Sequence, residues 1–209
     1  MKYTLHCFAQ SGNAYKAALM MNLCGADWQP EFVDFFNGGS KTPEYLALNS
    51  MGEVPVLVAD ELVISQSGVI LDYLAAESGK FGGKTATERR EVLRWILFDN
   101  HKLTSYFATL RFMRQFTGQE ENDVTRFLAG RTEAALKVLE RRVSDSEFVA
   151  GEQPTIADIS LCGYLFWPEE AGFDWQAFPG IEAWLSRIQA LPGWVHPYEL
   201  MPGYPLLES

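Results

Sequence analysis

Hydrophobic and polar positions in the first third of the chain follow two different periods. Residues 3–7 form a short apolar run typical of a buried strand, whereas residues 13–23 carry apolar side chains at the three- and four-residue spacing of a helix. The recurring patterns predict strands at residues 3–7, 28–35, 52–58 and 62–64. Helices are predicted at residues 13–23 and 42–45, each following one of the first two strands, and at residues 66–77 after the last strand. This order joins a parallel crossover unit to an antiparallel hairpin in one α/β domain.

Only helical patterns follow the glycine-rich linker that begins at Gly79. Within this second part, Thr155 and Asp158 have the spacing of a capping box, with Asp in place of the usual Glu, ahead of an apolar segment. The periodicity predicts helices over residues 87–116, 123–143, 155–167 and 181–190.

The composition is that of a globular protein with two domains. The 209 residues are 47% hydrophobic, enough for a sizeable core, and we expect an α/β domain at residues 1–78 and an all-helical domain at residues 86–209. Acidic residues number 27 and basic residues 17, giving a net charge of -10. Because no cluster of Lys and Arg stands out, we expect no nucleic-acid partner, and an anionic ligand has to be held by local donors.

The sequence favours a cytoplasmic protein without a metal site. No apolar run approaches the roughly 20 residues of a membrane span, and the first residues lack the pattern of a signal peptide. The three cysteines are odd in number and widely spaced, which fits the reducing cytoplasm better than a disulfide framework. The three histidines are scattered along the chain, so we expect no metal site.

Four short motifs carry a resemblance to a known family. They are Ser11-Gly12-Asn13-Ala14-Tyr15-Lys16, Gly52-Glu53-Val54-Pro55-Val56-Leu57, Ile64-Ser65-Gln66-Ser67 and Pro154-Thr155-Ile156-Ala157-Asp158. In this order and spacing the chain resembles the cytosolic glutathione transferases along nearly its whole length. The resemblance implies a thioredoxin-like βαβαββα domain followed by an all-helical domain, glutathione as co-substrate and a homodimer.

Two motifs supply the expected glutathione-binding residues. By pattern alone Val54-Pro55 is an ordinary trans bond at the start of an edge strand, whereas the resemblance implies a cis bond and pairing of the Val54 backbone with the cysteinyl residue of glutathione. Gln66 and Ser67 precede a helix, whose first N–H groups suit a carboxylate, although Ser67 could serve only as a cap. The resemblance assigns the γ-glutamyl end of glutathione to both. For its glycyl carboxylate we prefer Lys41, which follows a glycine loop, over Lys16.

Activation of the glutathione thiol is expected at the first strand-to-helix junction. Ser11 and Asn13 lie where a hydroxyl, an amide and a helix N-terminus can donate toward a sulfur anion, and either residue could also cap the helix. The motif looks like the serine- or threonine-Pro-Asn pattern of certain bacterial members, with Gly12 in place of proline. Cys7 is a rival nucleophile, but its place within the first strand favours a buried core role.

The second domain is expected to bind the electrophile. Tyr106, Phe107 and Arg111 lie on the long helix where relatives build this pocket, although such residues are more often core or interface. The leading function is conjugation of the glutathione thiolate to a hydrophobic electrophile. The alternatives are glutathione-dependent reduction of disulfides or peroxides, and a non-catalytic interaction module of the same fold.

Overall fold

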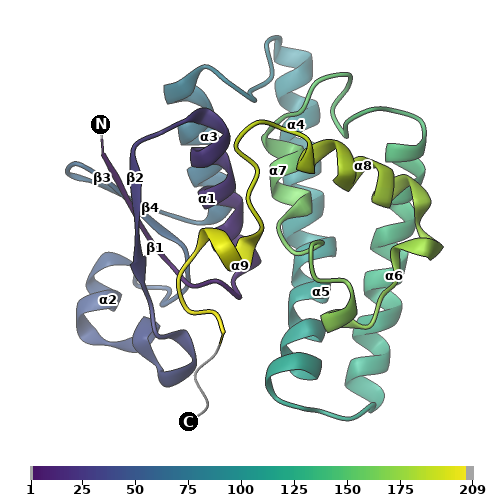
Figure 1. Ribbon diagram of the computed structural model, residues 1–209, viewed down its shortest axis with the longest axis horizontal. Coiled ribbons are helices and arrows are strands. Elements are labelled where there is room, and N and C mark those ends of the chain that lie inside the picture. The colour runs from purple at the N-terminus through teal and green to yellow at the C-terminus, as the bar shows by residue number, and fades with distance from the viewer. Residues whose placement is uncertain (1, 206–209) are drawn as a thin grey trace. The chain divides into compact units, whose positions relative to one another are not determined.

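The structure is a computed structural model that describes residues 2–205 (Figure 1). It divides into two compact units, and in its described part the first comprises residues 2–80 with 191–205, the second residues 81–190. The segment after Ala190, which the sequence placed with the helical domain, therefore belongs to the first unit. Hydrogen bonds hold it there: the Ala9 N–H donates to the Pro202 carbonyl at 2.7 Å, and the Tyr15 hydroxyl to the Val195 carbonyl at 2.9 Å. The functional domain limits remain a prediction.

A four-stranded mixed sheet forms the base of the first unit. Its strands are β1 (Tyr3–Cys7), β2 (Trp28–Phe32), β3 (Val56–Ala59) and β4 (Leu62–Ser65), in the spatial order β2-β1-β3-β4. β1 runs parallel to β2 and antiparallel to β3, and β3 and β4 form the predicted hairpin. The predicted fold class is confirmed, although the second strand ends earlier than expected, at Phe32, and the third begins later, at Val56.

Helices α1 (Gly12–Cys24) and α3 (Ser67–Ser78) pack against each other on the same side of this sheet (Figure 1). Almost every residue of α1 is buried, in keeping with its mostly apolar sequence. Two shorter helices, α2 (Pro43–Leu48) and α9 (Pro197–Leu200), complete the unit, and the sequence did not predict α9. Because β1 leads into α1 and β4 into α3, both strand-to-helix junctions fall at one end of the sheet.

The second unit is helical, as predicted. Its helices are α4 (Ala86–Phe98), α5 (Thr104–Arg111), α6 (Asp123–Ser144), α7 (Ile156–Cys162) and α8 (Pro179–Gln189). The predicted helix at 87–116 is continuous in extent but contains two π-helical segments, Asp99–Leu103 and Phe112–Phe116. Among the described residues, no helix is long and apolar enough to cross a membrane.

The capping box at the start of α7 is formed as the sequence predicts. The Thr155 side chain accepts the Ala157 N–H, and the Asp158 carboxylate accepts the Thr155 N–H at 2.9 Å. Asp158 also accepts hydrogen bonds from the Val149 N–H and the Trp184 indole, and its burial raises its pKa. Since this carboxylate joins three parts of the second unit, its role is structural.

Candidate functional site

Two helices of the first unit begin beside each other, and the predicted activating residues lie at this point. Ser11 is the N-cap of α1, and its hydroxyl oxygen accepts the Ala14 N–H at 3.1 Å. Asn13 follows in the first turn, and its Oδ1 accepts a hydrogen bond from the hydroxyl of Ser67, the first residue of α3, at 3.4 Å. The structure therefore brings Ser67 next to Asn13 and the N-cap Ser11, which precede it by more than 50 residues in the sequence.

These contacts determine which hydrogen-bond donors remain for a ligand. The oxygen of Ser11 caps α1, and none of the described residues accepts its hydroxyl hydrogen. Asn13 uses its carbonyl oxygen toward Ser67, which turns its NH₂ group away from that contact. A hydroxyl, an amide and the N-termini of two helices thus lie near one another, an arrangement that favours an anion.

The loop before β3 contributes exposed backbone to the same end of the unit. The Val54–Pro55 peptide bond is cis, as the resemblance implies. Val54 packs against the buried side chains of Val33, Tyr45 and Val56. Within the described chain its N–H and C=O have no backbone partner, so they can pair with an extended peptide.

Side chains fix the two residues that precede Val54. The Lys41 ammonium donates to the Gly52 carbonyl at 2.8 Å, while the Tyr45 hydroxyl and the Asn49 amide donate to the Glu53 carbonyl at 2.9 and 2.8 Å. The predicted carboxylate-binding Lys41 therefore lies directly beside the loop. Tyr45 and Asn49 were not singled out from the sequence, because a hydrogen bond to a loop carbonyl leaves no spacing signal.

Gln66 joins this loop to the start of α3. Its backbone lies in the left-handed region at φ 69°, and its Nε2 donates to the Glu53 carboxylate at 3.0 Å and to the Met51 sulfur at 3.1 Å. Glu53 lies in one of the four motifs but was not itself proposed as a site residue from the sequence. Of the predicted residues of the first unit, Asn13 and Ser67 contact each other, and Gln66 contacts Glu53. Ser11, Lys41 and Val54 lie on the adjoining turns.

Cys7 and Lys16 are core residues. Both are completely buried, and burial raises the pKa of the Cys7 thiol to about 12. A thiol in this environment stays protonated and unreactive at neutral pH. Lys41, which is exposed, is therefore the better candidate of the two lysines for a carboxylate of a ligand.

The predicted electrophile-binding residues lie in the second unit. Phe107 is fully buried and stacks on Phe173, and the buried Arg111 guanidinium pairs with the Glu170 carboxylate at 2.7 Å. Their burial favours the core role that the sequence also allowed. Tyr106 is partly exposed, and its hydroxyl accepts a hydrogen bond at 3.3 Å from Arg131, which lowers the Tyr106 pKa.

A metal site was not expected from the sequence. Among residues 2–205, no three His, Cys, Asp or Glu side chains are grouped so that they could hold a metal ion.

Comparison with known proteins identifies the two parts of the chain separately. Residues 10–77 match the model of the glutathione S-transferase N-terminal domain, and residues 102–192 match that of the glutathione S-transferase C-terminal domain. A glutathione S-transferase of Xanthomonas campestris pv. campestris is 32% identical over 72% of this chain and 76% of its own length.

Two further comparisons extend over most of the chain. The crystal structure of a glutathione S-transferase from Pseudomonas fluorescens superposes with a TM-score of 0.88, at 35% identity over 93% of this chain and 98% of that one. The disulfide-bond oxidoreductase YfcG of Escherichia coli is 25% identical over 88% of this chain and 89% of its own length.

Proposed function

The chain belongs to the glutathione S-transferase family, and from this premise we propose that it transfers the glutathione thiolate to an electrophilic carbon of a hydrophobic molecule. The observation that carries the proposal is the hydrogen bond between Ser67 and Asn13, which joins the N-termini of α3 and α1. Two helix N-termini and three polar side chains form a donor-rich site in a chain of net charge -10.

Ser11 and Asn13 would activate the thiol. A thiol of pKa about 8.5 is only about 3% ionised at pH 7, and lowering its pKa by two would raise that fraction to about 75%. The Ser11 hydroxyl hydrogen, the Asn13 NH₂ group and the N-terminus of α1 would donate to the sulfur anion and so lower the thiol pKa. The thiol proton goes to solvent. The thiolate then forms a carbon–sulfur bond, and the leaving group departs with the electron pair of the bond that breaks.

The rest of glutathione would bind along the adjoining turns. The Val54 backbone would pair with the cysteinyl residue as an added strand, and Pro55 fixes the chain direction there. Lys41 would hold the glycyl carboxylate, and Gln66 and Ser67 the γ-glutamyl end, with the carboxylate at the first N–H groups of α3.

Calorimetric titration with glutathione, followed by an assay of turnover with an aryl halide, tests this proposal. We expect binding in the millimolar range or tighter and release of halide that depends on glutathione. No detectable binding at millimolar glutathione would contradict the proposal.

A second candidate function is the reduction of disulfides or peroxides by bound glutathione, which the similarity to the Escherichia coli disulfide-bond oxidoreductase supports. Two glutathione thiols would be oxidised to one disulfide while the substrate disulfide gains two electrons and two protons. Because Cys7 is buried and protonated, the thiolate would have to come from glutathione. Turnover with a disulfide or hydroperoxide, but none with an aryl halide, would favour this function.

We also propose that the protein is a homodimer in which the long helices of the second unit provide much of the contact. Leu93 and Leu97 of α4 and Phe127 of α6 are 54%, 60% and 60% exposed, and their burial against a second copy of the chain would stabilise a dimer. Gel filtration is expected to give twice the mass of one chain.

A further inference from the structure

The turn between β1 and α1 is bound to the C-terminal segment of the first unit, residues 191–205. Ala9 and Gln10, the two residues before Ser11, are buried. The Ala9 N–H donates to the Pro202 carbonyl, and the Gln10 amide donates to the Gly203 carbonyl, both at 2.7 Å. Two consecutive residues of the turn are therefore tied to two consecutive residues of the segment.

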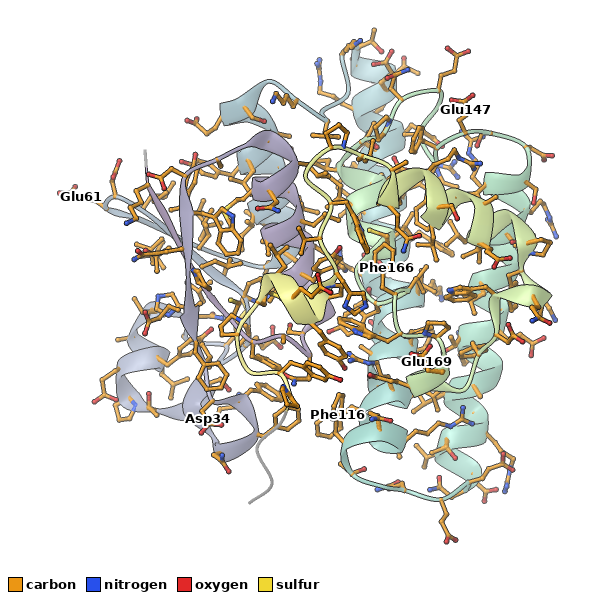
Figure 2. All side chains as sticks on the ribbon, in the orientation of Figure 1. Asp34, Glu61, Phe116, Glu147, Phe166 and Glu169 are labelled. Atoms are coloured by element: carbon orange, nitrogen blue, oxygen red, sulfur yellow. The ribbon has the colours of Figure 1, made fainter. Side chains whose placement is uncertain are left out.

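Gly203 also lies close to strand β2. Its φ is 94°, and a Cβ there would lie 2.6 Å from a ring carbon of Phe32, the last residue of β2. Asp34, labelled in Figure 2, lies on the loop that follows this strand. Because Gly203 has no side chain, the segment can pass close to both Gln10 and Phe32.

The position of this turn determines where the Ser11 hydroxyl lies. The Ser11 N–H closes the turn by donating to the Phe8 carbonyl at 3.0 Å, and its side chain caps α1. A hydrogen bond from the hydroxyl to a sulfur anion weakens steeply when its distance or angle changes. We propose that Gln10 is a positioning residue, whose hydrogen bond to Gly203 fixes the turn so that the Ser11 hydroxyl is directed at the glutathione sulfur, an inference that rests on the proposed function.

Replacing Gln10 by Met in the full-length protein tests this role, because Met is of similar length and donates no hydrogen bond. Gln10→Met is expected to raise the pKa of the bound glutathione thiol by about 0.5, about half the effect of removing the Ser11 hydroxyl. At pH 5.5, where the thiol is mostly protonated, kcat with an aryl halide should fall about threefold, whereas at pH 8.5 it should change little. The KM for glutathione should change less than twofold, because the rest of the tripeptide binds to other turns.

Asn22→Leu is the matched control. The Asn22 amide also donates to a carbonyl of the C-terminal segment, that of Gly193, at 2.9 Å, but Asn22 lies near the other end of α1. Like Gln10→Met, this change replaces an amide by an apolar side chain of similar size. It should lower the Tm by a similar amount and leave the thiol pKa and the pH profile of kcat as they are in the unaltered protein.

A second pair of variants acts on the segment and leaves Gln10 unchanged. Gly203→Ala strains a left-handed backbone and places a Cβ against Phe32, so it should displace the segment and raise the thiol pKa as well. Gly193→Ala is its control, because Gly193 also has φ 94° and its Cβ would lie 2.8 Å from the Asn22 carbonyl oxygen. This control should lose stability without a change in the thiol pKa.

The ultraviolet absorbance of the bound thiolate, followed against pH, distinguishes the outcomes. An unchanged or lowered thiol pKa in Gln10→Met or in Gly203→Ala would overturn the role of Gln10 and leave the proposed function standing, as would an equal rise in the matched control. If one of the two variants does not fold, the other and its control decide. Failure of the unaltered protein to bind glutathione would instead remove the proposed function, and the role of Gln10 with it.

Discussion

At the scale of single residues, Ser11 combines a structural and a proposed chemical role. Its oxygen caps α1, and its hydroxyl hydrogen is the group that would stabilise the thiolate. The sequence could predict both roles, because a strand-to-helix junction with Ser and Asn has few alternatives. It could not predict the contact of Asn13 with Ser67, which depends on how α1 and α3 pack.

Replacing Ser11 or Asn13 by Ala is predicted to raise the pKa of the bound glutathione thiol by about one, since each change removes one hydrogen bond to an anion. The ultraviolet absorbance of the thiolate, followed against pH at saturating glutathione, measures this. Ser11→Ala should also lower the free energy of unfolding by about 1 kcal/mol through the lost cap.

Thr85→Ala is the control for that loss, because Thr85 caps α4 in the second unit by accepting the Glu88 N–H. It should cost a similar amount of stability without altering the thiol pKa. An unchanged titration of the thiolate in both Ser11→Ala and Asn13→Ala would reject the activation scheme.

The thiol of Cys7 is predicted to be unreactive in the native protein. Burial raises the pKa of its thiol to about 12, so folding favours the neutral form. This contribution to stability is fully present below the pKa of about 8.5 that the thiol has in an unfolded chain, and it is lost as the pH rises toward 12. Iodoacetamide at pH 8 should therefore alkylate the partly exposed Cys24 of the native protein and spare Cys7, as mass spectrometry of peptides would report.

Activity offers a second test of Cys7. Cys7→Ala should retain turnover as well as Cys162→Ala does, because both remove a buried thiol and neither touches the proposed site. Rapid alkylation of Cys7 in the native protein, or a loss of turnover confined to Cys7→Ala, would indicate that Cys7 is the nucleophile.

At the scale of elements, the spacing of hydrophobic residues predicted well where helices and strands lie. It predicted poorly the irregular turns within a helix and the burial of its individual side chains. The spacing of apolar residues over 87–116 predicts one continuous α-helix, and it gives no sign of the π-helical turn at Asp99–Leu103. That turn forms where the buried Asp99 accepts hydrogen bonds from Thr104 and Ser160, contacts that depend on tertiary packing. For the same reason, the pattern could not separate the buried Phe107 from the partly exposed Tyr106.

The turn before β3 is predicted to be destabilised by a methyl group at Gly52. Gly52 has φ 60°, and a Cβ there would lie 2.6 Å from the Lys41 ammonium and 3.0 Å from the Ser40 carbonyl oxygen. Gly52→Ala should therefore cost at least about 1 kcal/mol of stability from backbone strain and also displace Lys41, weakening glutathione binding. Thermal unfolding and calorimetric titration measure the two effects.

Gly25→Ala is the control that has the backbone strain of Gly52→Ala without the displacement of Lys41. Gly25 has φ 69° at the end of α1, but no atom lies within 4 Å of its would-be Cβ. This variant should lose similar stability and keep its affinity for glutathione. Equal affinities in Gly52→Ala and Gly25→Ala would mean that the position of Lys41 is irrelevant to binding.

At the scale of the whole molecule, the net charge of -10 and an anionic ligand are compatible because the proposed site is local. Its cationic character comes from helix N-termini, polar hydrogens and Lys41, all of which act over a few ångströms. The sequence indicated this much, since no basic cluster could supply a long-range field. What it could not indicate was that the carboxylate of Glu53 would contact Gln66, one of the residues of the proposed site.

Salt should therefore have little effect on glutathione binding. The Debye length falls from about 14 to about 4 Å between 0.05 and 0.5 M salt, which screens the repulsion by the distant acidic surface more than the short contacts to the ligand. We expect the Kd to change by less than about threefold over this range. Lys41→Gln should weaken binding and flatten the remaining salt dependence, because it removes the one lysine in the proposed site. A loss of affinity of more than about tenfold in the unaltered protein would mean that long-range attraction dominates, and would place the ligand on a basic surface other than this site.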